Sequence, residues 1–155
     1  MRKWGSYVWS RRRFLRTFCG GWAAVGTGLV PVSSLSGAPF RKVIPSSGES
    51  LPVIGMGTWI TFNVGPSPEL RAARTEVMRA FLGHGGGMVD SSPMYGSAEE
   101  VIGHSLAAMG DDAGLFSATK VWTRSARAGA GQMAESRSLW GLERFDLMQV
   151  HNLLG

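Results

Sequence analysis

The sequence predicts an α/β fold with a parallel sheet, and its alternation of apolar runs with segments of helical periodicity is the main reason. Apolar runs lead to Trp59, Asp90, Lys120 and His151, and segments with helical spacing of apolar residues separate them. Asp90 and Lys120 lie 30 positions apart, and Lys120 and His151 lie 31 positions apart. This spacing is about one strand–helix–strand unit, and successive units of that kind build a parallel sheet.

The length suits one domain, and the charge distribution separates a basic leader from the remaining body. All six Lys and Arg residues of the leader precede residue 39, where there is no Asp or Glu. The body carries 10 Lys and Arg against 11 Asp and Glu, a net charge of −1, so we expect no nucleic acid partner. The single cysteine, Cys19, lies in the leader, so the body can form neither an internal disulfide nor a thiolate metal site.

Residues 1–38 resemble a twin-arginine export signal. The segment Ser10-Arg11-Arg12-Arg13-Phe14-Leu15-Arg16 has the paired arginines, the Phe and the Leu of such signals, and an apolar stretch follows from Phe18 to Val32. This stretch is shorter than the roughly 20 residues of a transmembrane helix, and Ser36-Gly37-Ala38 is the candidate cleavage site. The resemblance implies the twin-arginine translocase as a partner and a periplasmic location, with a cytoplasmic location if export fails.

The body, residues 39–155, begins with a predicted hairpin and a first buried strand. Two short apolar runs flank Ser-Ser-Gly-Glu between Arg41 and Ile54, which is typical of a hairpin. Residues 54–59 predict the buried strand. Its glycines do not continue to a G-x-G-x-x-G pattern, so no dinucleotide-binding fingerprint is predicted there.

The next segments predict two helices. Ser67 supplies an N-cap and Pro68 a proline at the first helical position. The spacing of the first helix predicts a buried face made of Leu70, Ala73, Val77 and Phe81. Ser97 and Glu100 match a capping box at the start of the second helix. Its predicted buried stripe consists of Ile102, Leu106 and Met109, and Gly110 ends it.

A third helix and a fourth strand complete the predicted series. The helix is expected over residues 132–140, because Gly129 and Gly131 disfavour an earlier start at a cost of about 1 kcal/mol for each glycine in a helix interior. Residues 145–150 predict the fourth strand. The series therefore alternates strand and helix and reaches four strands.

Four polar side chains are predicted to meet at one edge of this sheet. Asp90, Lys120 and His151 end three successive strands, and Tyr95 lies in the loop after the first of these strands. The carboxyl ends of parallel strands lie at the same edge, where active sites of α/β proteins are placed. A carboxylate, a phenol, an ammonium and an imidazole at one edge can share a proton network.

With these residues placed, the segment from Arg41 to Asn152 resembles the first half of an aldo-keto reductase. The matching motifs are Gly55-Met56-Gly57-Thr58-Trp59, Asp90-x4-Tyr95-Gly96-x2-Glu99, Thr119-Lys120-Val121-Trp122 and Asp146-Leu147-x2-Val150-His151-Asn152. Their order and spacing make the signal specific. The resemblance implies a (β/α)8 TIM-barrel type of fold, of which residues 39–155 would supply about the first four β/α units.

The resemblance implies a catalytic tetrad of Asp90, Tyr95, Lys120 and His151. Tyr95 would be the general acid that protonates a carbonyl oxygen. A free phenol ionises only well above neutral pH, and the Lys120 cation, paired with Asp90, would favour the phenolate. His151 would hold and polarise the carbonyl oxygen.

The resemblance also implies NADPH as the cofactor and a small aldehyde or ketone as the substrate. Thr58, Asp90 and Asn152 would contribute to cofactor binding, and Trp59 and Trp122 would line the substrate pocket. In this family the second half of the barrel supplies most of the cofactor site.

Two functional readings follow, because a complete (β/α)8 barrel takes about 250 residues. The first is an NADPH-dependent carbonyl reductase. The alternative is a truncated, catalytically inactive reductase fragment, or a half-barrel that needs a second half or self-association, since four strands leave open sheet edges.

Other catalytic classes fit the sequence poorly. Ser91 and Ser92 are not part of a G-x-S-x-G elbow, so a hydrolase is not predicted. His84, His104 and His151 lack metal-ligand spacing, so no metal site is predicted.

Overall fold

A computed structural model describes residues 37–110 and 114–152 of the chain. The twin-arginine motif and Cys19 lie outside the described residues, so export, the translocase partner and the boundary at residue 38 stay predictions. Among the described residues, none of the helices has the length and apolar character needed to cross a membrane.

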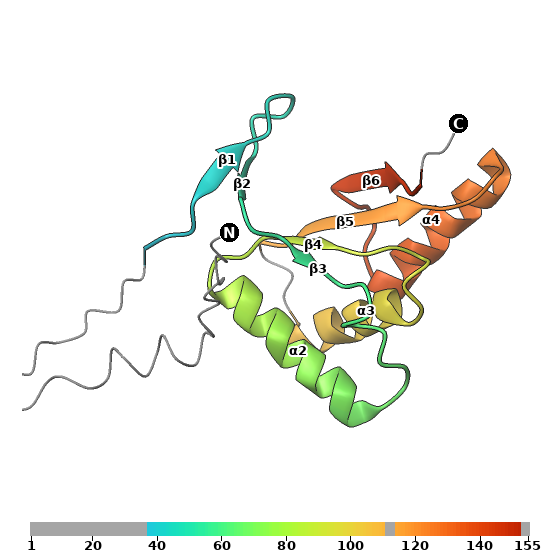
Figure 1. Ribbon diagram of the computed structural model, residues 1–155, viewed down its shortest axis with the longest axis horizontal. Helices are drawn as coiled ribbons and strands as arrows, with labels where there is room; N and C mark the ends of the chain where they lie inside the picture. The colour runs from blue at the N-terminus through green and yellow to red at the C-terminus, as the bar shows by residue number, and fades with distance from the viewer. Residues whose placement is uncertain (1–36, 111–113, 153–155) are drawn as a thin grey trace, which may run out of the picture. The chain divides into compact units, whose positions relative to one another are not determined.

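Four parallel strands form the sheet that carries the site (Figure 1). They are β3 (Met56–Gly57), β4 (Met88–Asp90), β5 (Phe116–Val121) and β6 (Leu147–Val150), and they lie side by side in chain order. The register places Gly57 beside Asp90, and Lys120 beside Gln149. The predicted α/β fold with a parallel sheet is therefore confirmed, and all four strands end at one edge.

Three helices of the described residues lie on the same side of this sheet (Figure 1). They are α2 (Pro68–Gly83), α3 (Ala98–Met109) and α4 (Ala126–Trp140). Each connects one parallel strand to the next, as expected for β/α units. Ser67 caps α2 as predicted, because its Oγ accepts a hydrogen bond from the Leu70 N–H at 3.3 Å.

The predicted hairpin is confirmed as two antiparallel strands. They are β1 (Arg41–Val43) and β2 (Ser50–Pro52), with Lys42 opposite Leu51. Pro52 packs against Gly87, which immediately precedes β4. The hairpin therefore contacts the chain at the amino end of β4, away from the edge that carries the polar residues.

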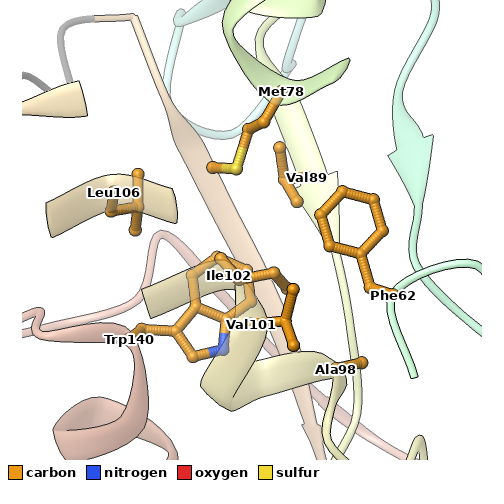
Figure 2. Close-up of a cluster of buried hydrophobic side chains, with 8 residues drawn as sticks. All are labelled: Phe62, Met78, Val89, Ala98, Val101, Ile102, Leu106 and Trp140. Atoms are coloured by element: carbon orange, nitrogen blue, oxygen red, sulfur yellow. The ribbon is translucent and has the colours of Figure 1, made fainter. Parts of the chain in front are cut away.

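The core lies between the sheet and the helices, and Figure 2 shows its buried side chains. Ile102 is fully buried and Leu106 is nearly so, whereas Met109 is partly buried against the cluster, so the predicted stripe of α3 is confirmed. Trp140 at the end of α4 is the largest fully buried side chain among the described residues and packs edge-on against Phe145. Burying an apolar side chain of this kind stabilises a fold by about 1.5–3 kcal/mol. This shared core holds the three helices against the strands.

The predicted buried face of α2 is wrong for most of its residues. Leu70 and Val77 are 45% and 49% exposed and Ala73 is exposed, although Phe81 is partly buried against the core. The buried positions of α2 are Thr75 and Met78 instead. Polar contacts with α3 favour this orientation, because the Thr75 hydroxyl donates to Ser105 Oγ at 3.1 Å and Arg71 pairs with Glu100 at 2.7 Å.

The capping box predicted for α3 does not form. Ser97 occupies the N-cap position without a side-chain bond to the helix. Its Oγ accepts from the Gly65 N–H at 2.8 Å and donates to Asn63 Oδ1 at 3.1 Å, and Glu100 is engaged by Arg71. A distant loop therefore competes successfully for the hydroxyl that a local motif would use.

Helix α4 begins at Ala126, six residues earlier than predicted from residue 132. Ser125 caps it by accepting a hydrogen bond from the Ala128 N–H at 3.3 Å. Gly129 is buried and a side chain there would meet Val121 and Thr123, so the absence of a side chain lets α4 approach β5. Close packing and the cap thus offset the poor helix propensity of the two glycines.

Candidate active site

The structure brings the four predicted catalytic side chains to the carboxyl edge of the sheet. Asp90 ends β4, Lys120 lies one position before the end of β5, and His151 follows β6 directly. Tyr95 lies in the loop between β4 and α3. The spatial part of the prediction is thus met, and the catalytic roles stay predictions.

An ion pair between β4 and β5 is the centre of the site. Lys120 Nζ lies 2.6 Å from Asp90 Oδ2 and donates a second hydrogen bond to the Ser91 carbonyl at 2.8 Å. The side chains are 13% and 27% exposed, so the pair is only partly screened by water. An ammonium has three donors, and these contacts use two of them, which leaves one N–H for another acceptor.

Tyr95 lies near both this ion pair and His151. Lys120 Nζ is 5.4 Å from the centroid of the Tyr95 ring, within the range of a cation–π contact. The Tyr95 and His151 rings meet edge-on, with centroids 6.0 Å apart and planes at 80°. His151 Nδ1 is buried and has no hydrogen-bond partner among the described residues. The Tyr95 ring therefore has both a cation and an imidazole as close neighbours.

A tight turn after Tyr95 holds this phenol-bearing loop. Gly96 has a φ of +61°, a conformation that L side chains rarely adopt, and an added Cβ would collide with the Asn63 side chain. Asn63 Oδ1 in turn accepts a hydrogen bond from the Ser97 N–H at 3.0 Å. The glycine thus lets the loop that follows β3 clamp the loop that carries Tyr95.

Gln149 is a residue of the site that the sequence analysis missed. Its Nε2 donates to Asp90 Oδ1 at 3.0 Å, across 59 positions of sequence. Side chains two positions apart in an extended strand point to the same face. Gln149 lies two positions before His151, so the sequence could have indicated that both side chains point toward the site. That inference requires knowing which face of β6 carries the site.

Glu99 is a second polar group whose partners the sequence did not reveal. The carboxylate is 3% exposed and accepts three hydrogen bonds. The donors are Thr119 Oγ1 at 2.6 Å, Ser136 Oγ at 3.0 Å and Trp140 Nε1 at 3.2 Å. Glu99 therefore ties α3 to α4 and to the residue of β5 that precedes Lys120.

The predicted cofactor and pocket residues occupy different environments. Thr58 is fully buried, and its hydroxyl donates to the Asp90 carbonyl at 2.9 Å, so it joins the end of β3 to β4. Asn152 is exposed and has a φ of +53°. Trp59 and Trp122, which follow β3 and β5, are 65% and 50% exposed. Their cofactor and substrate contacts stay predictions.

No cluster of three or more His, Cys, Asp or Glu side chains suited to a metal ion occurs in residues 37–110 and 114–152.

A parallel β/α sheet with polar side chains at the carboxyl ends of its strands is common to (β/α) barrels and doubly wound α/β folds. The profile of the Aldo/keto reductase family matches residues 53–153. The chain therefore belongs to the aldo/keto reductase family. No curated protein sequence matches it.

Solved structures of aldo-keto reductases share the fold. A thermostable aldo-keto reductase crystallised with the inhibitor epalrestat has a TM-score of 0.62 and 24% identity, over 72% of this chain and 42% of that one. A Klebsiella pneumoniae aldo-keto reductase in complex with NADPH has a TM-score of 0.61 and 23% identity, over 72% and 39%.

A Bombyx mori aldo-keto reductase in complex with NADP has a TM-score of 0.56 and 24% identity, over 74% of this chain and 38% of that one. The chain thus spans about four-tenths of the length of these structures, consistent with a partial barrel.

Proposed function

We propose that these residues form the acid–base half of a barrel enzyme that reduces a small aldehyde or ketone with NADPH. The observation that carries the proposal is the Lys120–Asp90 ion pair, whose ammonium lies 5.4 Å from the centre of the Tyr95 ring. A cation so placed stabilises a phenolate, which is what a tyrosine becomes when it has given up its proton.

Each side chain then has one part in the reaction. Tyr95 donates its phenolic proton to the carbonyl oxygen of the substrate, and the O–H bond of the phenol breaks as the alcohol O–H forms. Lys120 stabilises the resulting phenolate, and Asp90 neutralises and orients Lys120. His151 donates a hydrogen bond to the carbonyl oxygen and polarises it.

The donor set fits a nicotinamide cofactor, because it supplies a proton and hydrogen bonds but no hydride. When bound, the cofactor supplies the hydride to the carbonyl carbon. NADPH and NADP are present in two of the similar reductase structures. On this chain the exposed amide of Asn152 would bind the cofactor directly. Thr58 would act indirectly, because its hydroxyl donates a hydrogen bond to the backbone carbonyl of Asp90.

The variant Tyr95→Phe tests the proposal, because it keeps the ring and removes only the hydroxyl. We expect the rate of carbonyl-dependent NADPH oxidation to fall roughly 100- to 10,000-fold. Quenching of tryptophan fluorescence by NADPH should be unchanged, and this serves as the control for folding and cofactor binding. Turnover close to that of the unaltered protein would refute the role of Tyr95.

A second candidate is a half-barrel that needs a complementary half before it binds the cofactor. Within the part of the chain that the structure describes, β3 and β6 each pair with one strand only, and Val150 on β6 is 62% exposed. Open edges and exposed apolar side chains of this kind favour association with another strand.

Titration of the 155-residue chain with NADPH separates the two candidates. Saturable quenching of tryptophan fluorescence by the chain alone would favour a cofactor site within these residues. Quenching that appears only after a separately produced second half of a reductase barrel is added would favour the half-barrel. Absence of quenching in both samples would favour an inactive fragment.

A further inference from the structure

We propose that Gln149 is a positioning residue that fixes the carboxylate of Asp90 so that its other oxygen is directed at Lys120. The catalytic consequence of this role rests on the proposed reductase function, whereas the structural consequence does not. Gln149 would act through Asp90 and Lys120 and would not touch the substrate.

The first step of the argument is that each oxygen of Asp90 has a separate partner. Oδ2 lies 2.6 Å from Lys120 Nζ, and Oδ1 accepts from Gln149 Nε2 at 3.0 Å. The carboxylate therefore bridges three neighbouring strands, with Asp90 on β4, Lys120 on β5 and Gln149 on β6.

The second step concerns the freedom of the Asp90 side chain. The terminal torsion of an aspartate is broad, so a single contact through one oxygen leaves the carboxylate free to rotate. Asp90 is 27% exposed, and water can therefore compete for the other oxygen. The Gln149 amide occupies that oxygen and restricts the rotation, because two bonds in different directions define the plane of the carboxylate.

The third step links this plane to Tyr95. Lys120 also donates to the Ser91 carbonyl at 2.8 Å, so its ammonium is held between a backbone oxygen and Asp90. A carboxylate that rotates would let the ammonium shift from its place beside the Tyr95 ring. The backbone register supports the arrangement, since Lys120 and Gln149 are direct neighbours on adjacent strands.

Two substitutions test the role of the amide. Gln149→Met keeps the length and approximate shape of the side chain and removes the donor. Gln149→Asn keeps the amide and shortens its reach, so it serves as a milder variant that retains polarity. Met148→Leu is the matched control, because Met148 is the neighbouring strand position and points to the opposite face.

The first readout is independent of activity. The scalar coupling across the hydrogen bond between Lys120 Nζ and Asp90 Cγ, together with the exchange rate of the Lys120 ammonium protons, is measured by NMR on the isotope-labelled full chain. We expect Gln149→Met to lose the coupling and to exchange these protons at least about tenfold faster, because Asp90 loses its bond to the amide and holds the ammonium less firmly, and Gln149→Asn to show a smaller change of the same sign. The control should match the unaltered chain.

The second readout is the steady-state rate of carbonyl reduction. It is measured for each variant under the conditions in which the unaltered chain turns over. We expect kcat to fall roughly 10- to 100-fold in Gln149→Met and less in Gln149→Asn, with the KM for NADPH unchanged in both. A merely structural role would affect kcat and KM together or reduce the folded fraction, which circular dichroism monitors.

The outcomes distinguish the positioning role from the proposed reaction. A coupling that persists unchanged in a folded Gln149→Met variant would overturn the positioning role, whatever the activity. Loss of the coupling in a folded variant would support it, even if the unaltered chain shows no reductase activity and the proposed function fails. Loss of the coupling in Met148→Leu as well would overturn the assignment to Gln149, because any change on β6 would then suffice.

Discussion

At the scale of single residues, the buried carboxylate of Glu99 shows how α3, α4 and β5 are joined. Its three donors are neutral groups, two hydroxyls and an indole N–H, and each is buried. The contribution of such a carboxylate to stability depends on all of its donors, because removing the carboxylate leaves each of them without a partner. Glu99 therefore joins β5, the strand that carries Lys120, to α3 and α4.

Replacing Glu99 with Ala should lower the free energy of unfolding by about 3–5 kcal/mol, because three buried donors lose their acceptor and a cavity forms. Glu99→Gln is the matched variant and should cost about 1 kcal/mol, since an amide oxygen can still accept while the hydroxyls can also act as acceptors. Urea denaturation followed by circular dichroism measures both values. Equal losses for the two variants would show that the negative charge, and not the set of acceptors, matters.

At the scale of elements, α3 and α4 pack against each other through a glycine. A Cβ placed on Gly103 of α3 would lie 1.7 Å from the Leu139 carbonyl oxygen of α4, closer than any real contact. Because the obstacle is backbone, a side-chain rotation cannot relieve it. The position thus sets how near the two helices approach and how Trp140, which follows Leu139, enters the core.

Gly103→Ala should destabilise the fold by at least about 2 kcal/mol, because the helices must separate to admit the methyl group. Gly131→Ala in α4 is the control, since a Cβ there meets nothing within 4 Å. It should stabilise by about 0.5–1 kcal/mol through the better helix propensity of Ala. Thermal denaturation of both variants checks the prediction, and a neutral Gly103→Ala would argue against close contact between α3 and α4.

At the scale of the whole molecule, the parallel sheet has open edges among the described residues. β3 and β6 are the outer strands, and Leu147 and Val150 on β6 are 39% and 62% exposed. Leu70 and Val77 add an exposed apolar stripe on α2. The described part of the chain thus offers both unpaired backbone and apolar surface, which together favour pairing with a complementary half or with a second copy.

The 155-residue chain should therefore self-associate as its concentration rises, and Val150→Lys should shift it toward the monomer. A lysine on an edge strand disfavours pairing because its charge would have to be desolvated. Light scattering coupled to size-exclusion chromatography measures the mass. Phe40→Lys is the control, since Phe40 is 70% exposed but lies beside the hairpin and not on the parallel sheet. A monomer at all concentrations, or an equal effect of Phe40→Lys, would contradict the role of the β6 edge.

Much of the fold followed from local patterns in the sequence. The hairpin, the N-cap at Ser67 and the buried stripe of α3 depend on residues close together in the chain, and the structure confirms them. Helix α4 starts earlier than its propensity predicts, because the packing of Gly129 against β5 offsets the low helix propensity of glycine.

The buried face of α2 and the partners of Ser97 could not be read from the sequence. Thr75 and Met78 are the buried positions of α2 in place of the predicted apolar stripe, and contacts of α2 with Ser105 and Glu100 of α3 favour this orientation. Ser97 is bound by a loop about 30 positions earlier, which a local capping pattern does not reveal. Each error concerns a competition between local and distant partners.

The sequence by itself determined the order of strands and helices and the meeting of Asp90, Tyr95, Lys120 and His151 at one edge. The physical reason is that parallel strands all end on the same side, so spacing alone brings their last residues together. Only the tertiary structure decided that Gln149 holds Asp90 and that Glu99 binds Thr119, Ser136 and Trp140. These hydrogen bonds join residues 20 to 59 positions apart, and their formation depends on side-chain directions that no local periodicity encodes.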